Sequence, residues 1–166
     1  QQEKRPDCRS CGSYHASHVS TARSVAAVRD ARARGAKATC AVAVHNLAFD
    51  EERLGDYDVD YKLVPPLRPQ SDVDALLRGL EEGTVDAVVS DHRPCSSLEK
   101  DSEFSAADAG AIALPFCFSQ LLGLVHAGRL SLKRAVQALT SGPAQVLGVP
   151  APALRVGASA DLVLVQ

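Results

Sequence analysis

Histidine, asparagine and aspartate residues stand at the ends of three segments whose composition predicts strands. They are His15 and His18, then His45 and Asn46, then Asp91 and His92. Imidazole nitrogens and carboxylate oxygens are the ligands that zinc prefers in proteins. A carboxylate beside a metal-bound water can also take the water's proton. The pattern therefore indicates a zinc site with Asp91 as its base, although any one of these residues alone is more often a plain polar residue or a loop cap.

Two other groups of residues give weaker signals. Cys8 and Cys11, with the two histidines that follow them, could form a tetrahedral zinc site, but their spacing is much tighter than that of a zinc finger. An unstructured segment with incidental cysteines is the better interpretation. Lys62 and Arg68 flank a Pro-Pro pair and could bind an anion, although solvated surface charge is the commoner state of such residues.

The hydrophobic pattern predicts the elements that must position these residues. Strands are expected at residues 14–19, 38–44, 61–64 and 86–90, and a separate terminal strand at residues 161–165. Helices are expected from the Ser20-Thr21 cap through Ala33, from 72 to 82 after a Ser71 cap, and at residues 112–126, 132–139 and 144–147. Strands alternating with helices indicate an α/β fold with a parallel sheet.

The number of strands limits the architecture. Four βα units are half of an eight-stranded barrel, and a free-standing doubly wound sheet would fit the count equally well. We divide the chain into an irregular segment at residues 1–12, a partial barrel at 13–150, and a segment of a small β domain at 151–166. In a barrel, the carboxyl ends of the strands form the active face, which is where His18, His45 and Asp91 are expected.

Composition excludes several classes of protein. The 166 residues carry a formal net charge of −2 and no basic block, which argues against a nucleic-acid binder. No apolar run approaches the ~18 residues of a membrane span. Five cysteines without framework spacing indicate a reducing, cytoplasmic compartment. The sequence contains no methionine, even at position 1, so we expect a processed chain or a fragment.

The order of several motifs extends over about nine-tenths of the chain. The main ones are His15-Ala-Ser-His18-Val-Ser-Thr21, Lys62-Leu-Val-Pro-Pro-Leu-Arg68, Ser90-Asp91-His92-Arg-Pro94 and Gly157-Ala-Ser-Ala-Asp161-Leu162. In this order and spacing they resemble the dihydroorotases of the amidohydrolase superfamily. The Pro-Pro-Leu-Arg turn favours dihydroorotase over allantoinase.

The resemblance implies a (β/α)8 barrel with a small β domain built from both termini. It also implies a zinc enzyme of pyrimidine biosynthesis that interconverts carbamoyl-aspartate and dihydroorotate. This chain would hold barrel strands five to eight, the closing helices and the last strand of the β domain. His18 matches a metal-binding histidine, and Asp91 matches the metal-binding aspartate that is also the general acid and base. Lys62 and Arg68 match a turn that shapes the site.

The chain also departs from the pattern that the resemblance implies. Asn46 stands where a metal-binding histidine is expected, and His45 could replace that histidine only if the strand end rotated. Positions that contact substrate are also changed: Val64, Cys95, Ala109 and Gly110. A His-x-His pair and a bridging modified lysine, which complete the family's metal site, have no counterpart in this sequence.

Three functions remain open at this point. The chain could be part of a zinc dihydroorotase, inactive without its N-terminal half. It could instead be a non-catalytic scaffold that binds aspartate carbamoyltransferase, or an unrelated small α/β binding domain. Half a barrel leaves a strand edge open. We therefore expect this chain to aggregate, to pair with a second copy, or to bind the missing half.

Overall fold

The computed structural model describes residues 12–165, so Cys8 and Cys11, with the zinc site considered for them, lie outside the described residues. A parallel sheet of three strands, β1 (Tyr14–Ala16), β2 (Ala38–Ala43) and β3 (Ala87–Val89), forms the centre of the molecule. The strands lie in the order of the sequence, with β2 pairing with both of its neighbours. This arrangement confirms the expected α/β class and its parallel βα units.

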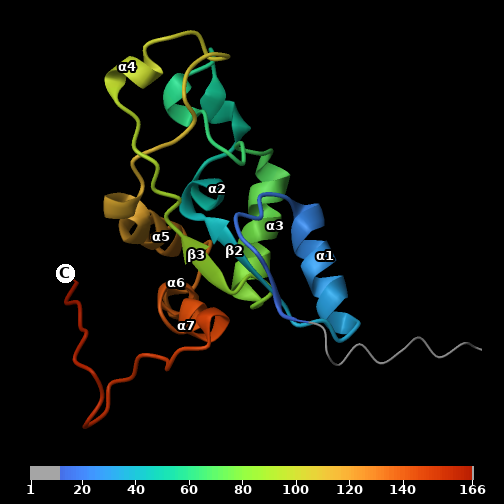
Figure 1. Cartoon of the computed structure of the whole chain (residues 1–166), viewed down its shortest axis with the longest axis vertical. Coiled ribbons are helices and arrows are strands. Elements are labelled where there is room, and N and C mark those ends of the chain that lie inside the picture. The colour runs from blue at the N-terminus through green and yellow to red at the C-terminus, as the bar shows by residue number, and fades with distance from the viewer. Residues whose placement is uncertain (1–11, 166) are drawn as a thin grey trace, which may run out of the picture.

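Helices surround the sheet, as Figure 1 shows. The longer ones are α1 (Ala22–Ala33), α3 (Gln70–Glu81), α5 (Cys117–His126) and α6 (Leu132–Leu139). The shorter ones are α2 (Val44–Ala48), α4 (Ser97–Lys100), α7 (Ser141–Leu147) and three 3₁₀ turns at Glu51–Leu54, Val59–Tyr61 and Leu114–Phe116. Helix α1 packs against α3 and β2, whereas α6 and α7 pack against β3. No helix in residues 12–165 has the length and apolar character needed to cross a membrane.

Local sequence explains the best-defined elements. Strand β2 is almost wholly buried and consists of small and β-branched residues, as expected of a parallel strand that is covered on both faces. Helix α1 begins at the predicted cap, where the Thr21 hydroxyl accepts a hydrogen bond from the Ser24 N–H. Helix α3 buries Val73, Leu76 and Leu80 at helical spacing, so one face of it enters the core.

The predicted strand at residues 61–64 is wrong. This segment contains the end of a 3₁₀ turn and then leads into the cis Val64–Pro65 bond, and β2 pairs directly with β3 instead. Pro65 and Pro66 have no N–H to donate to a sheet ladder, which limits pairing at this point. The sheet therefore has three strands, not four.

Other boundaries also differ from the prediction. Strand β1 ends at Ala16 and not at Val19, and helix α5 starts at Cys117 and not at Ile112, after the 3₁₀ turn at Leu114–Phe116. Helix α3 starts at Gln70 with Pro69 as its N-cap residue, because the N–H groups of Asp72 and Val73 both donate to the Pro69 carbonyl. Helix α7 starts at Ser141, earlier than predicted. Residues 161–165 do not form the expected terminal strand and are exposed. A strand needs a neighbour to satisfy its backbone, and none lies beside these residues within the described chain.

Candidate functional site

The side chains of His18, His45 and Asp91 meet at the carboxyl ends of the three strands. His18 follows β1, His45 lies in the first turn of α2 after β2, and Asp91 follows β3. His18 Nε2 is 3.5 Å from Asp91 Oδ1, and His45 Nε2 is 3.5 Å from Asp91 Oδ2. The aspartate thus lies between two imidazoles, each facing a different carboxylate oxygen. This edge of the sheet is the one expected to carry chemistry in a βα barrel.

The backbone at this site adopts an unfavourable conformation. His18 has φ 55° and Asp91 has φ 48°, both in the left-handed region. That conformation costs roughly 1–2 kcal/mol for a residue with a side chain. The hydrogen bond from Val19 N to Ala41 O, 2.9 Å long, holds the chain just after His18. Strain of this kind concentrates at functional sites, which supports a functional assignment for this cluster.

The three side chains differ in their depth. The side chain of His45 is 4% exposed, that of Asp91 is 25% exposed and that of His18 is 36% exposed. Burial lowers the pKa of His45 below its usual value and outweighs the raising effect of the Asp91 charge. The lowered pKa favours the neutral form of the His45 imidazole. Neither of its ring nitrogens, both buried, has a hydrogen-bond partner.

Asn46 has no hydrogen bond or ion pair to this cluster among the described residues. Its Nδ2 donates to the Pro66 carbonyl at 3.3 Å, whereas its buried Oδ1 has no hydrogen-bond partner. His45 is the residue that points to Asp91. Helix α2 begins at Val44, and consecutive residues of a helix point about 100° apart, which separates the two side chains.

The other histidines at the strand ends have structural contacts. His92 Nδ1 accepts hydrogen bonds from the N–H groups of Ala113 and Leu114, at 3.1 and 3.2 Å. It therefore fixes the 3₁₀ turn before α5. His15 Nδ1 lies 2.8 Å from the hydroxyl of Thr39, its register partner in the sheet. Neither ring contributes to the His18–His45–Asp91 cluster.

Lys62 is not available as an anion site. Its ammonium donates to the carbonyls of Phe104 and Ala107, at 2.6 Å each, and to that of Ser105 at 3.1 Å. The three carbonyls use the whole donor capacity of the side chain. Lys62 is thus neither a solvated surface charge nor a free anion ligand, and it fixes the loop that follows α4.

The residues expected at substrate-contact positions are dispersed. Val64 is largely exposed, and Cys95 lines a surface hollow together with Val59 and Lys100. Gly110 donates its N–H to the Lys62 carbonyl at 2.9 Å, beside Ala109. Gly110 has φ 154°, and a Cβ there would lie 2.4 Å from the Arg93 carbonyl oxygen. In the described part of the chain, no ion pair or side-chain hydrogen bond joins these four residues to Asp91.

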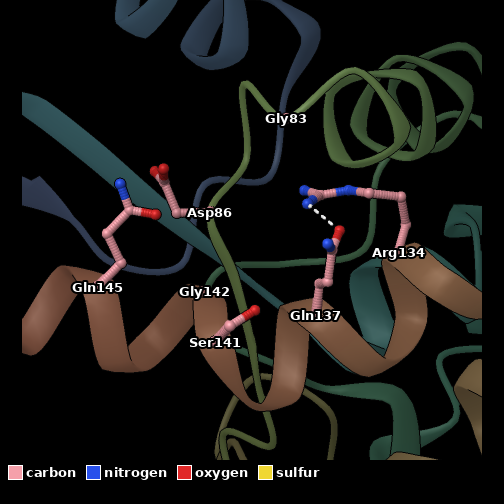
Figure 2. A pocket seen from close by; sticks show the side chains of 7 residues that line it. All are labelled: Gly83, Asp86, Arg134, Gln137, Ser141, Gly142 and Gln145. Atoms are coloured by element: carbon pink, nitrogen blue, oxygen red, sulfur yellow. Dashed lines mark hydrogen bonds between the residues drawn. The ribbon is translucent and has the colours of Figure 1, made fainter. Parts of the chain in front are cut away.

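A second hollow, of about 160 Å³, lies at the opposite end of the sheet (Figure 2). Its lining residues are Gly83, Asp86, Arg134, Gln137, Ser141, Gly142 and Gln145. Its charged groups already have partners, because Asp86 pairs with Arg32 and Arg134 donates to the carbonyls of Leu80 and Val85. This end of a βα barrel is typically structural, and we assign the hollow no ligand.

The donors at the strand ends suit zinc in type but not in number. His18 and Asp91 present one imidazole and one carboxylate oxygen on the open side of the cluster. Catalytic zinc usually takes three protein ligands. Within residues 12–165, no three His, Cys, Asp or Glu side chains are arranged to hold a metal ion. The described residues thus bring together two donors of the types that zinc prefers, fewer than a catalytic zinc site usually has.

Comparison with known proteins identifies the family of the chain. The model of the Amidohydrolase family matches residues 9–166, which is nearly the whole chain. The chain belongs to the amidohydrolase family. Over 157 residues it is 47% identical to a dihydroorotase from Anaeromyxobacter dehalogenans (strain 2CP-C), covering 93% of this chain and 36% of that protein. It is 40% identical over 152 residues to a dihydroorotase from Deinococcus radiodurans, covering 92% of this chain and 36% of that protein.

Solved structures of other amidohydrolases share the fold. A D-hydantoinase from Thermus sp. superposes with a TM-score of 0.81 at 25% identity, over 90% of this chain and 34% of that one. A dihydropyrimidinase from Brevibacillus agri gives a TM-score of 0.80 at 24% identity, with the same coverage. The chain thus spans about a third of the length of the proteins it matches. It is a dihydroorotase-like amidohydrolase segment with the fold of part of a TIM barrel.

Proposed function

We propose that this chain carries part of the active site of a dihydroorotase and is inactive until the rest of a barrel joins it. The reaction is the interconversion of carbamoyl-aspartate and dihydroorotate. The observation that supports the proposal is the Asp91 carboxylate, which lies between His18 and His45 at the carboxyl ends of three parallel strands. Two imidazoles and a strained carboxylate at this edge suit acid–base chemistry on a small polar substrate.

His18 and Asp91 are the residues that would hold zinc. Zinc, when bound, supplies Lewis-acid activation of water and of the amide carbonyl. The partly exposed carboxylate of Asp91 takes a proton from the attacking water in the hydrolytic direction. It then gives that proton to the ring nitrogen as the carbon–nitrogen bond breaks. In the cyclisation direction the same carboxylate removes the proton from the attacking nitrogen.

The open side of the sheet supports the need for a second part. Within residues 12–165, strand β1 pairs with β2 alone, and its Tyr14 side chain is largely exposed. An unpaired strand edge readily accepts another strand. We propose that the missing barrel half pairs there, and that a second copy of this chain occupies the edge when that half is absent.

A non-catalytic scaffold is the second candidate function. Asn46, Val64 and Cys95 stand where the resemblance implies groups that bind metal or substrate. Within residues 12–165, none of them has an ion pair or a side-chain hydrogen bond to Asp91. A chain with those losses could retain its fold as a binding partner of aspartate carbamoyltransferase.

Complementation separates the two functions. The chain would be mixed with the part of the A. dehalogenans dihydroorotase that it does not match, and dihydroorotate hydrolysis would be followed. The enzyme proposal predicts activity in the mixture only, abolished by Asp91→Ala and unaffected by Asp30→Ala, a change at an exposed aspartate. An inactive mixture in which the two parts demonstrably associate would contradict it. Co-elution of the chain with aspartate carbamoyltransferase would then support the scaffold.

A further inference from the structure

We propose that His45 is a positioning residue for Asp91, with its Nε2–H directed at Asp91 Oδ2. This contact leaves Oδ1, on the side of His18, to face the metal or the substrate. The inference rests on the proposed function insofar as Asp91 is taken to be the reacting carboxylate. In this proposal His45 orients Asp91 through a hydrogen bond and is not itself a metal ligand.

The depth of the three side chains supports this role. His45 is 4% exposed, and its neighbours Val44 and Leu47 are fully buried. Asp91 and His18 retain 25% and 36% of their side-chain exposure. A metal ion with bound water, or a substrate, can therefore approach Asp91 from the His18 side, whereas His45 closes the opposite side.

The hydrogen-bonding state of His45 points to the same contact. Both ring nitrogens are buried and unpartnered, and an imidazole ring carries at least one N–H in either protonation state. Asp91 Oδ2 is 3.5 Å from Nε2, so an approach of about 0.5 Å would bring the pair to ordinary hydrogen-bond distance. Catalytic hydrogen bonds are often long before substrate binds and tighten in the complex. Carboxylates that bind metal are commonly held in this way by a second hydrogen bond.

Nitrogen NMR of the histidine rings tests the proposal without requiring activity. The chain contains five histidines, and the His45→Gln variant identifies the His45 signals by their loss. We expect a proton on Nε2 of His45 and none on Nδ1. Zinc alone, added to the chain, should shift the ring nitrogens of His18 and leave the Nε2 proton of His45 in place. Magic-angle spinning allows the same measurement on self-associated protein.

Two results would overturn the proposal. One is a His45 ring that carries its proton on Nδ1. The other is loss of the Nε2 proton when zinc is added, which would make His45 a ligand. Asp91→Ala should also move the Nε2 resonance, whereas the control Asp30→Ala should not. If the His45 Nε2 resonance does not move in the Asp91→Ala variant, the two side chains do not interact, which would also contradict the proposal.

Zinc affinity gives a second measurement with a conservative variant. Glutamine retains an amide N–H near the place of Nε2, whereas leucine fills the site without a donor. Changes to such supporting residues typically weaken metal binding about 10–100-fold. We expect that loss for His45→Leu and a loss of less than about 3-fold for His45→Gln. Equal, large losses in both variants would contradict the proposal. An inactive complemented barrel that retains the Nε2–H contact would argue against the proposed function alone.

Discussion

The guanidinium of Arg32 forms an ion pair with the carboxylate of Asp86, with 2.6 Å between Nη2 and Oδ2. Arg32 lies in the last turn of helix α1, and Asp86 immediately precedes β3. The same Asp86 oxygen accepts a hydrogen bond from Cys40 N in β2 at 2.7 Å, and Arg32 Nε donates to the Ala38 carbonyl at 2.7 Å. One pair of side chains therefore fixes a helix and two strands at the end of the sheet opposite Asp91.

Asp86→Ala should lower the free energy of unfolding by about 2–3 kcal/mol. The change leaves a part-buried guanidinium and a backbone N–H of β2 without their acceptor. Urea denaturation monitored by circular dichroism would measure the loss. The control is Arg29→Gln, which breaks the exposed Arg29–Glu82 ion pair, whose Nη2–Oε2 distance is 2.7 Å. This change should lower the free energy of unfolding by less than about 1 kcal/mol. Equal losses in the two variants would refute the structural role of Asp86.

Gly142→Ala should lower the free energy of unfolding by about 3 kcal/mol. A Cβ at this position would lie 2.1 Å from the Asp86 carbonyl oxygen, so α7 would have to move away from the start of β3 (Figure 2). Gly123→Ala in α5 is the matched control, since its Cβ would meet nothing within 4 Å. That change should be neutral or stabilise by up to about 1 kcal/mol through helix propensity. Thermal unfolding of both variants checks the difference.

Lys62→Met should release the loop that contains Phe104. The ammonium holds three carbonyls of this loop and also lies 5.4 Å from the centre of the Phe104 ring. Methionine retains most of the apolar stem but donates nothing. We expect chymotrypsin to cleave after Phe104 at least about 10-fold faster in the variant, as local opening becomes easier. Lys133→Met, at an exposed position of α6, should leave the cleavage rate unchanged.

Cys40 should resist alkylation. Burial raises the pKa of its thiol to about 11, and the nearby Asp86 charge adds to the effect. Burial also raises the pKa of Cys117. Because the thiolate is the reactive form, iodoacetamide at pH 8 should modify Cys95, which is partly exposed, well before either of these residues. Peptide mass mapping over time would show the order, and early labelling of Cys40 in folded protein would contradict its placement.

Glu81 should contribute stability that disappears in acid. The Ser131 N–H donates to its carboxylate at 3.0 Å, and this bond together with the Ser131 hydroxyl lowers the pKa of Glu81 below 4.5. A group whose pKa is lower in the folded state stabilises the fold above its unfolded pKa, and this stabilisation is lost as the pH falls through the folded pKa. Glu81→Gln should therefore lower stability at pH 7 and have less effect below pH 4. Urea titrations at both pH values test this, and an equal effect at both would argue against it.

Much of the secondary structure follows from local pattern. The Thr21 cap and the end of α1 at Ala33, and both ends of α6, lie where the sequence places them. Helix periodicity and capping depend on residues within one or two turns of each other, so they can be predicted from the sequence without knowledge of tertiary contacts. The buried run of β2 is equally clear, because a strand covered on both faces has only small or apolar residues.

The candidate site is only partly determined in this way. Composition and motif order are enough to place His18, His45 or Asn46, and Asp91 at strand ends and to indicate the family. Long-range packing sets the remaining features. His45 faces Asp91 while Asn46 bonds to Pro66, residues 61–64 stay out of the sheet, and residues 161–165 form no strand. Those outcomes depend on distant partners. A strand forms when another strand satisfies its backbone, and a side chain's neighbours are set by where remote segments come together.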